Sequence, residues 1–408
     1  MSVVTKADAR THRPFGQYAA VAQVDELYWD PFDEEIDTDP HPTWKRMRDE
    51  APVYRNDKFD FYALTRYHDV EAAHRDPSTF SSARGTVLEL MGHDLSSTGQ
   101  IIFLDPPAHT ELRHLVSRAF TPRHTAVLED RIRGFCADML DAQQGRDSFD
   151  YLQDFGAKLP SMVISSLLGV PDEDQETFRH AVERIFHIEP GVGMVNEESM
   201  AAGREIHHYL AGLLDERRTS PRDDLLTSLA QAGLSRTATT DFANLLLAAG
   251  TETVARLLGW AAVVLAAHPD QRAELAADHA LIPNAVEELL RYEAPSPVQG
   301  RWTTRDVELH DTVIPANSKV LLLTGAAGRD ERVYPDADQF DIHREHHHHV
   351  SFGYGIHFCV GAALARLEGR IALQETLVRH PTWEVDHDRA VRLHTSTVRG
   401  YSQVPIVV

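Results

Sequence analysis

The segment Ser351-Phe-Gly-Tyr-Gly-Ile-His-Phe-Cys-Val-Gly361 decides the fold of this chain, because it sets one cysteine, Cys359, in a loop rich in glycine. A helical pattern follows directly, over 361–370. All three glycines of the loop are predicted to take positive φ, so that the loop can lie flat against a bulky planar partner. A thiolate near a helix N-terminus is stabilised by the helix dipole and by free N–H groups.

Three interpretations of Cys359 are open at this point. A nucleophilic cysteine needs a base, and His357 lies two residues away. A metal ligand needs clear space around the sulfur, which the glycines supply. A structural cysteine in a tight turn is the third interpretation, and it holds only if the rest of the chain has no partners for a cofactor.

The pattern Phe352-x-x-Gly355-x-His357-x-Cys359-x-Gly361 resembles the haem-binding signature of the cytochrome P-450 superfamily, in its soluble bacterial type. In that family a cysteine thiolate holds the iron of haem b, iron protoporphyrin IX. The resemblance implies that Cys359 is the metal ligand. It also implies that Phe352, His357 and Gly361 bind the cofactor.

A long apolar pattern from Ser235 to His268 predicts a helix roughly 50 Å long, enough to cross a whole domain. Ser235 is the expected N-cap, and the pair His268-Pro269 ends the helix. In its middle lies Ala249-Gly-Thr-Glu-Thr253, where an apolar core would be expected. A glycine followed by hydroxyl residues weakens the helical hydrogen bonds, so a local bulge is predicted there.

Alone, the small and polar segment fits a solvent-facing notch or a helix–helix contact equally well. Together with the cysteine loop it resembles the oxygen-activation segment of the family. The resemblance implies that Glu252 and Thr253 form the catalytic acid–alcohol pair that delivers protons to bound dioxygen. It places Ala249 and Gly250 at the cofactor, with Gly250 leaving room for the oxygen.

Glu288 and Arg291 are three residues apart and share one helical face. Such a pair is common on protein surfaces and carries little information by itself. Its place between the other motifs matches the Glu-x-x-Arg helix of the family, and the resemblance adds Arg344 as a third member. These three residues are predicted to position the cysteine loop and not to react.

A haem carries two propionates, which need cationic partners. His109 and Arg113 stand four residues apart on one predicted helical face, and Arg301 follows an irregular segment at 295–300. Each would be ordinary surface chemistry if it stood alone. The resemblance assigns His109, Arg113, Arg301 and His357 to the propionates, and arginine suits this role because its guanidinium binds carboxylates in pairs of hydrogen bonds.

The predicted fold is mainly α with a smaller β region: the cytochrome P-450 fold, a single haem-containing domain crossed by the long central helix. The chain has 408 residues, 42% of them hydrophobic, and no linker or internal repeat divides it. We expect an irregular N-terminal segment over 1–44 and the haem-thiolate domain over 45–408. Further helices are predicted over 128–140, 175–188, 200–217 and 361–379, and strands over 53–54, 59–65, 307–309, 319–323 and 404–408.

The only two cysteines are Cys136 and Cys359. Cys136 lies in an apolar helical context and is expected in the core. The N-terminus has no apolar stretch for a signal peptide, and the longest apolar run, 257–267, has 11 residues, too short for a bilayer. We expect a cytoplasmic protein without a membrane anchor, and a monomer.

A net charge of −22 argues against nucleic acid or anionic lipid as a partner. The chain has no flavin module and no cysteine cluster for iron–sulfur, so the electron donor must be separate. The resemblance implies a ferredoxin served by a ferredoxin reductase. A docking face could use Arg113, His114, Arg118, Arg123, Arg366 and Arg370, although these also fit a solvated helix face.

The implied activity is that of a monooxygenase that inserts one atom of O2 into a hydrophobic small molecule, a terpenoid, steroid, fatty-acyl or polyketide-like compound. The alternative is a haem-binding sensor or electron carrier without oxygenase activity. The resemblance points to 85–92, 186–195, 297–298 and 396–398 as the substrate-pocket segments, and their small aliphatic side chains suit an apolar substrate.

Two features depart from the family pattern. Ala327-Gly-Arg-Asp330 stands where relatives usually read Ala-Asn-Arg-Asp, so a customary side-chain hydrogen bond is missing. The four histidines at 346–349 could chelate a divalent metal, or they form an exposed loop in which His349 alone matches the family.

Overall fold

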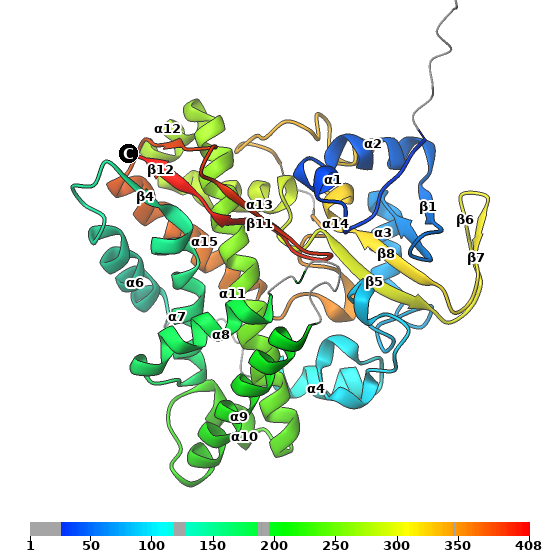
Figure 1. Cartoon of the computed structure of the whole chain (residues 1–408), viewed down its shortest axis with the longest axis horizontal. Helices are drawn as coiled ribbons and strands as arrows, with labels where there is room; N and C mark the ends of the chain where they lie inside the picture. The colour runs from blue at the N-terminus through cyan, green and yellow to red at the C-terminus, as the bar shows by residue number, and fades with distance from the viewer. Residues whose placement is uncertain (1–25, 118–127, 187–188, 190–195, 346–347) are drawn as a thin grey trace, which may run out of the picture.

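The computed structural model of the chain describes residues 26–117, 128–186, 189, 196–345 and 348–408. Figure 1 shows most helices gathered on one side of the molecule and the largest sheet on the other, with α11 running through the helical side. This is the mainly α arrangement with a smaller β region that the sequence predicts.

The long helix α11 spans Arg236–Ala267, and the Ser235 side chain caps it by accepting the N–H of Ala238 at 3.1 Å. The residues of its first half, up to Leu247, pack in one hydrophobic cluster. The residues of its second half, from Val254 onward, pack in another. The polar segment 249–253 therefore lies between the two cores. The predicted bulge there is wrong, because the helix is α-helical throughout.

The remaining helices surround α11 or cover the sheet. Four of them match the predicted ranges closely: α6 (Glu129–Asp141), α8 (Gln175–Ile185), α9 (Glu197–Thr219) and α15 (Ala362–Arg379). The others are α1 (Glu34–Thr38), α2 (His41–Glu50), α3 (Tyr67–Arg75), α4 (Ala108–Ser117), α7 (Lys158–Leu168), α10 (Leu225–Gln231), α12 (Pro269–Ala277), α13 (Ile282–Tyr292) and α14 (Thr324–Ala327).

The main sheet has five strands in the order β1-β2-β8-β5-β3. Their bounds are β1 Val53–Asn56, β2 Phe61–Leu64, β3 Phe80–Ser81, β5 Val298–Thr303 and β8 Lys319–Leu323. Only β2 and β8 pair in parallel. Along β8 the residues alternate between two hydrophobic clusters: Val320 and Leu322 face α3, and Leu321 and Leu323 face α2.

Smaller sheets complete the β region. The hairpin β6–β7 covers Val307–Leu309 and Thr312–Ile314, and β10–β11 covers Val391–His394 and Arg399–Gln403. The C-terminal strand β12, Pro405–Val407, lies between β4 (Ser148–Asp150) and β9 (Glu384–Val385). The β region is thus larger than the sequence predicts, because short strands paired over long sequence distances leave weak local patterns.

The described part of the N-terminal segment, residues 26–44, is not irregular, because it contains α1 and the start of α2. Trp29 and Trp44 are both 2% exposed and belong to the cluster on one face of the main sheet. The carbonyl groups at the end of α1 accept hydrogen bonds from Arg399, whose Nε lies 3.0 Å from the oxygen of Asp37. Residues from 26 onward therefore pack as part of the one domain.

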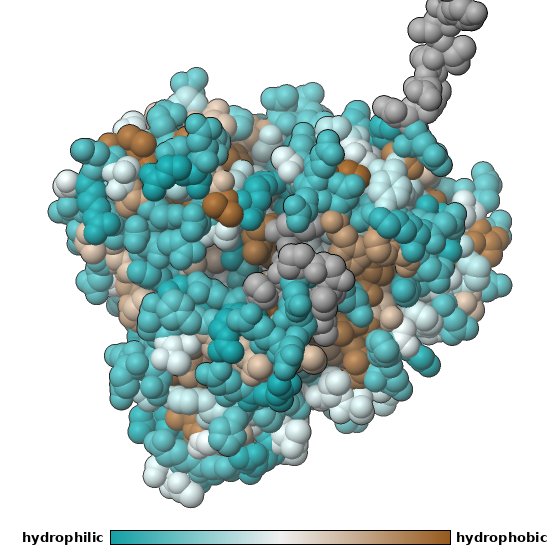
Figure 2. Space-filling model, in the orientation of Figure 1, coloured by the Kyte–Doolittle hydropathy of each residue, from teal (hydrophilic) through white to brown (hydrophobic). Residues whose placement is uncertain are grey.

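Among the described residues one helix, α11, is long and apolar enough to cross a membrane by length and composition. Of the 18-residue stretch of α11 with membrane-like hydropathy, 72% is buried inside the protein. Two hydrophobic clusters enclose it, so α11 is the core helix of this fold. Figure 2 shows a largely hydrophilic surface, with hydrophobic residues gathered near the middle of this face toward the sheet side.

Candidate active site

The cysteine loop lies between the main sheet and α15. Gly353 and Gly355 have φ of +68° and +67°, as predicted, and a Cβ on Gly355 would stand 2.5 Å from the carbonyl oxygen of His74. Gly361 instead has φ of −88°, so the predicted positive φ is wrong there. A Cβ at Gly361 would reach 4.0 Å from Cys359 Sγ, so the glycine keeps the space beside the sulfur clear.

The Cys359 residue is accessible to solvent, but protein atoms crowd the surroundings of its thiol. This crowding keeps water away from the thiol and raises its pKa, whereas the Gly361 N–H and the Arg113 and Arg366 guanidinium groups lower it. On α11, Ala249 is also exposed, in the middle of a helix that is otherwise mostly buried. Cys136 is fully buried, and burial raises the pKa of its thiol, which fits the predicted core role.

The four predicted propionate partners come together near this loop. The His109 ring, on α4, lies 4.4 Å from the His357 ring between centroids. Burial, followed by Arg301, His109 and Arg113, lowers the pKa of His357 to about 2. Arg301 is 4% exposed, and burial lowers its pKa to about 10. The four groups, drawn from α4, β5 and the cysteine loop, thus form one cluster of cationic and neutral donors.

His74 is a fifth member that sequence analysis missed. It lies on α3, is 3% exposed, and its Nδ1 is 3.3 Å from Arg301 Nη2. Burial lowers its pKa well below the usual value, with Arg301 and His357 adding to the shift. Its neighbours Val70 and Ala73 face the core, so its place on the apolar face of an amphipathic helix was the available signal.

Several nitrogens of this cluster have no hydrogen-bond partner: Nδ1 of His109 and Nε2 of His74 and His357 are buried and unpaired. The acid Asp105 is engaged, because it accepts the N–H of Ser82 at 3.0 Å and the hydroxyl of Ser81 at 2.5 Å. Buried donors without acceptors are costly. The cluster therefore suits a ligand that brings carboxylates of its own.

The polar segment of α11 carries a buried ion pair. Glu252 is 3% exposed, and its Oε1 accepts Arg256 Nε at 2.9 Å. Burial raises the pKa of Glu252, while Arg256 acts in the opposite direction. The Thr253 hydroxyl donates to the carbonyl oxygen of Ala249 at 2.9 Å, within the same helix. A Cβ at Gly250 would lie 3.4 Å from Ile164, so part of this glycine's space is used by α7.

A polar cavity of about 610 Å³ reaches this ion pair from the side of α8 and the β10–β11 hairpin. Both Glu252 and Arg256 line it, together with the Thr251 hydroxyl, which is buried and has no hydrogen-bond partner. Further toward α8 the lining includes Arg179 and Glu183. The cavity is roomy and polar enough to hold water.

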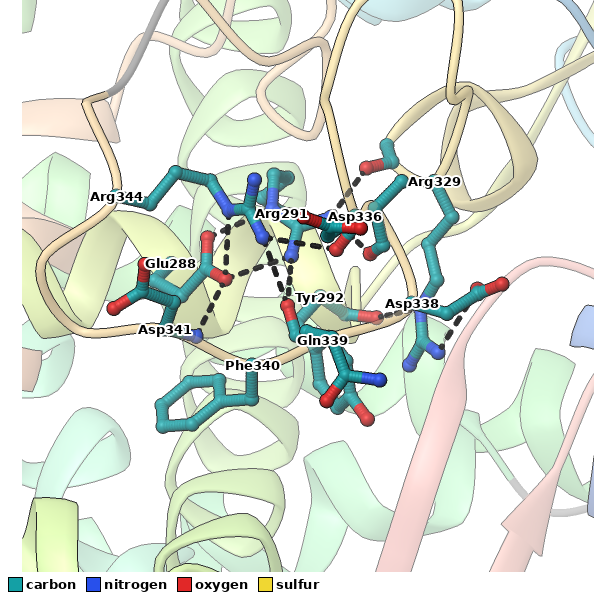
Figure 3. A network of polar contacts seen from close by, with 12 residues as sticks. Glu288, Arg291, Tyr292, Arg329, Asp336, Asp338, Gln339, Phe340, Asp341 and Arg344 are labelled. Carbon is teal, nitrogen blue, oxygen red and sulfur yellow. Dashed lines mark hydrogen bonds and ion pairs between the residues drawn. The ribbon is translucent and has the colours of Figure 1, made fainter.

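The predicted Glu288 network is present (Figure 3), and its members Glu288 and Arg291 are fully buried. Both oxygens of Glu288 accept from Arg291, at 2.7 Å each, and Oε1 also accepts Arg344 Nε at 3.1 Å. Arg291 Nη1 donates to the carbonyl oxygens of Gly328 and Ala337 at 2.8 and 2.7 Å. One carboxylate and two guanidinium groups therefore hold α13 against the irregular segment that leads to the cysteine loop.

Both departures from the family pattern lie near this network. A Cβ at Gly328 would stand 2.5 Å from the carbonyl oxygen of Arg291, so the glycine allows the backbone of this segment to approach α13 closely. His346 and His347 lie outside the described residues. His349 is buried and its Nε2 is 3.1 Å from Glu287, and the described parts of the chain hold no group of three metal-ligating side chains.

Some of the cationic residues proposed to dock an electron donor form ion pairs within the chain. Arg366 forms an ion pair with Glu287, and Arg370 with Glu129 at 2.9 Å. Arg113 and His114 lie on α4, and Arg118 and Arg123 lie outside the described residues. Arg366 and Arg370 are therefore not free cations on this face.

The site consists of an exposed sulfur on a glycine loop, a central helix with a polar middle, and a buried cluster of Arg301 and histidine nitrogens without hydrogen-bond partners. This combination defines a class of protein that holds a flat, thiolate-facing, carboxylate-bearing cofactor beside a long helix. A cysteine nucleophile is not favoured, because burial and its cationic neighbours lower the pKa of His357 to about 2, which makes it a weak base.

Comparison with known proteins gives the family. The cytochrome P450 family model matches residues 58–405. Cytochrome P450 130 of Mycobacterium tuberculosis is 40% identical over 389 residues, covering 90% of this chain and 95% of that protein. The vitamin D(3) 25-hydroxylase of Pseudonocardia autotrophica is 38% identical, with 90% and 94% covered. The structure of a mutant of P450 EryK in complex with erythromycin B superposes with a TM-score of 0.84 at 33% identity, covering 91% and 96%.

The chain belongs to the cytochrome P450 family and is a P450 monooxygenase. The family implies a haem iron cofactor. The residues present fit this group, because the unpaired nitrogens of His74, His109 and His357 and the buried Arg301 can meet two carboxylates.

Proposed function

We propose that this chain binds haem b through the Cys359 thiolate and oxidises a hydrophobic small molecule with O2, using electrons from a ferredoxin and its reductase. The observation that carries the proposal is the buried cluster of histidine nitrogens without hydrogen-bond partners and the buried Arg301 beside the exposed sulfur. A ligand that brings two carboxylates would compensate the buried guanidinium charge of this cluster.

Each residue of the cluster has a defined task. Arg113 and Arg301 bind the two propionates as guanidinium–carboxylate pairs, and His109 and His357 lie beside the same two groups. Phe352 and Gly361 border the sulfur, and Ala249 and Gly250 border the opposite side. Bound haem supplies the activation of O2; the protein residues supply its orientation, the sulfur ligand and the protons.

Protons reach this site through Glu252 in our proposal. The cavity of about 610 Å³ connects Glu252 with solvent-side polar groups, and the raised pKa of this carboxyl supports proton uptake from cavity water. Glu252 must leave Arg256 to pass the proton on. The Thr253 hydroxyl donates to Ala249 and so keeps its oxygen free to accept a hydrogen bond.

The substrate is proposed to be a large, hydrophobic ring compound of the terpenoid, steroid or polyketide type, or a fatty-acyl compound. One relative is named for hydroxylation of vitamin D3, and a structural relative was solved with erythromycin B. Two of the expected pocket segments meet, because the Ser396 hydroxyl donates to Glu89 at 2.7 Å. That bond engages Glu89, so it does not favour a cationic substrate. We propose a cytoplasmic monomer as the working form.

The ligand assignment is tested by the absorption spectrum of the dithionite-reduced, CO-bound protein. A thiolate pushes electron density onto the iron, so the Soret band should lie far to the red of that of a histidine-ligated haem. Cys359→His should lose the red-shifted band while haem remains measurable. A histidine-type Soret band in the native wild-type protein would mean that Cys359 is not the ligand.

The proton path is tested by coupling measurements on two variants. Thr253→Ala should retain haem and substrate binding but divert reducing equivalents to hydrogen peroxide, because the hydroxyl at the oxygen site is lost. Glu252→Gln should lower turnover at least tenfold, since the relay loses its ionisable group, and general acid–base steps contribute about 10²–10⁴-fold.

Thr240→Ala is the matched control, because Thr240 makes the same hydroxyl-to-carbonyl bond in α11, to Arg236 at 3.0 Å, far from the polar segment. It should leave the ratio of product to consumed cofactor unchanged. Normal coupling in Thr253→Ala together with normal turnover in Glu252→Gln would refute the proton path.

A further inference from the structure

Glu287 stands next to Glu288 on α13, but its carboxylate binds different partners. Arg366, in the second turn of α15, donates to it through Nε at 2.6 Å and Nη2 at 2.8 Å. His349 approaches the same carboxylate, with Nε2 3.1 Å from Oε2. His349 precedes the cysteine loop and Arg366 follows it, so one carboxylate connects both ends of the loop.

The hydrogen bonds of His349 connect Glu287 to the backbone of the loop. The N–H of Ser351 donates to His349 Nδ1 at 3.3 Å, so Nε2 carries the proton and donates to Glu287. The Ser351 hydroxyl is fixed in turn by the carbonyl oxygen of Leu290, at 2.6 Å. The next residue, Phe352, accepts the N–H of Cys359 at 2.9 Å. A short chain of hydrogen bonds therefore runs from Glu287 to the cysteine backbone.

Arg366, the second partner of Glu287, places a positive charge near the cysteine loop. The guanidinium carbon of Arg366 lies 4.5 Å from the centre of the Phe352 ring, and the bidentate bond to Glu287 fixes its plane. Glu287 is ionised in the folded protein, since Arg366 and His349 outweigh its burial and hold its pKa at about 2. The same Phe352 accepts the Cys359 N–H through its carbonyl oxygen at 2.9 Å, so the Arg366 charge lies beside the backbone segment that carries the sulfur.

We propose that Glu287 is a positioning residue for the Cys359 loop, and that its ion pair with Arg366 sets the positive charge that the sulfur experiences. This inference rests on the proposed thiolate ligation. It assigns Arg366 to the tuning of the sulfur and not to the docking of an electron donor. The Glu288 network holds the preceding segment separately, through Arg291 and Arg344.

The test compares the midpoint reduction potential of the haem-loaded full chain at low ionic strength, where partly exposed charges are least screened. Reduction adds negative charge, so loss of a nearby cation should lower the potential and loss of a nearby anion should raise it. Arg366→Met is expected to lower the potential, and Glu287→Gln to raise it. The double variant should return toward the wild-type value, and Arg366→Lys should stay close to it.

A purely structural role predicts a different pattern. Equal shifts in one direction for Glu287→Gln and Arg366→Met, or no shift in either, would overturn the proposal. If Glu287→Gln retains no haem, the contrast between Arg366→Met and Arg366→Lys decides, and equal potentials in those two variants would overturn it. Glu50→Gln, in an exposed pair with Arg46 on α2, is the control and should leave the potential unchanged.

The CO-bound spectrum of the wild-type protein separates the two levels of inference. A red-shifted Soret band combined with the wrong pattern of potentials refutes the role of Glu287 alone. A histidine-type band in the wild-type protein refutes the ligand assignment itself, and with it the reason for the charge at Arg366.

Discussion

At the scale of single residues, Glu368 on α15 is unusual. It is 2% exposed, its Oε2 has no hydrogen-bond partner, and burial alone raises its pKa to about 8. Near neutral pH the folded protein therefore holds this carboxyl mainly in its protonated form. The unfolded chain releases the same proton near the ordinary pKa of glutamate, about 4.3.

This difference predicts a stability that falls as pH rises. Between about pH 4.5 and pH 8 the unfolded state ionises Glu368 while the folded state does not, so unfolding becomes more favourable by on the order of 4 kcal/mol at pH 8. Glu368→Gln should remove this part of the pH dependence. Urea unfolding of both proteins at pH 5, 6.5 and 8 measures it.

The difference in free energy of unfolding between wild type and Glu368→Gln should change with pH. Any effect of the amide itself on stability is the same at every pH and does not alter this trend. A difference that is the same at all three pH values would show that Glu368 does not titrate in this way. Glu308→Gln, on the exposed side of β6, is the control and should follow the wild-type profile.

At the scale of elements, α13 is fixed by charges that have little or no access to water. The side chains of Glu288 and Arg291 are both 0% exposed, and Arg344 is 10% exposed. Removing one member of such a network leaves an uncompensated charge in the interior, which is far more costly than the loss of a surface pair. The α13 helix therefore depends on its full set of partners.

Glu288→Ala should lower the free energy of unfolding by about 3–5 kcal/mol and reduce haem retention, because Arg291 and Arg344 lose their shared carboxylate. Denaturant unfolding and haem content of the purified protein measure both effects. Glu50→Ala breaks an exposed pair, with side chains 38% and 50% exposed, and should cost less than about 1 kcal/mol. Similar losses in the two variants would contradict the role of burial.

At the scale of the whole molecule, the helices before residue 51 belong to the same body as the sheet. Trp44 on α2 reaches the backbone of α14, where a Cβ at Gly325 would lie 2.8 Å from its ring. Its cluster also includes Phe61, Leu321 and Leu323 from the central strands. The N-terminal helices therefore share the core of the domain.

Trp44→Ala should destabilise the protein by about 3–5 kcal/mol, the usual cost of a large cavity in a core. Thermal unfolding should remain a single transition at a lower temperature, since no separate unit is released. Val313→Ala, at a position 53% exposed on β7, is the control and should stay within about 0.5 kcal/mol of wild type. A neutral Trp44→Ala would restore the picture of an independent N-terminal segment.

The sequence by itself determined the features that depend on local patterns. The length of α11 follows from a long apolar pattern between a serine cap and His268-Pro269, and the predicted bounds agree with the structure to one residue. The strand over 319–323 and the positive φ of the glycines at 353 and 355 were also predicted from local patterns. The Glu288 network and the cluster of His109, Arg113, Arg301 and His357 came from resemblance, because isolated charged residues carry almost no local signal.

Only the tertiary structure decided which charges meet. The bond between Glu287 and Arg366 joins residues 79 positions apart, and the contact of His74 with Arg301 spans 227. It also decided that Trp29 and Trp44 lie in the core. Propensities and turns act over a few residues, whereas ion pairs and core packing form wherever the folded chain brings side chains together, so no local pattern encodes their partners.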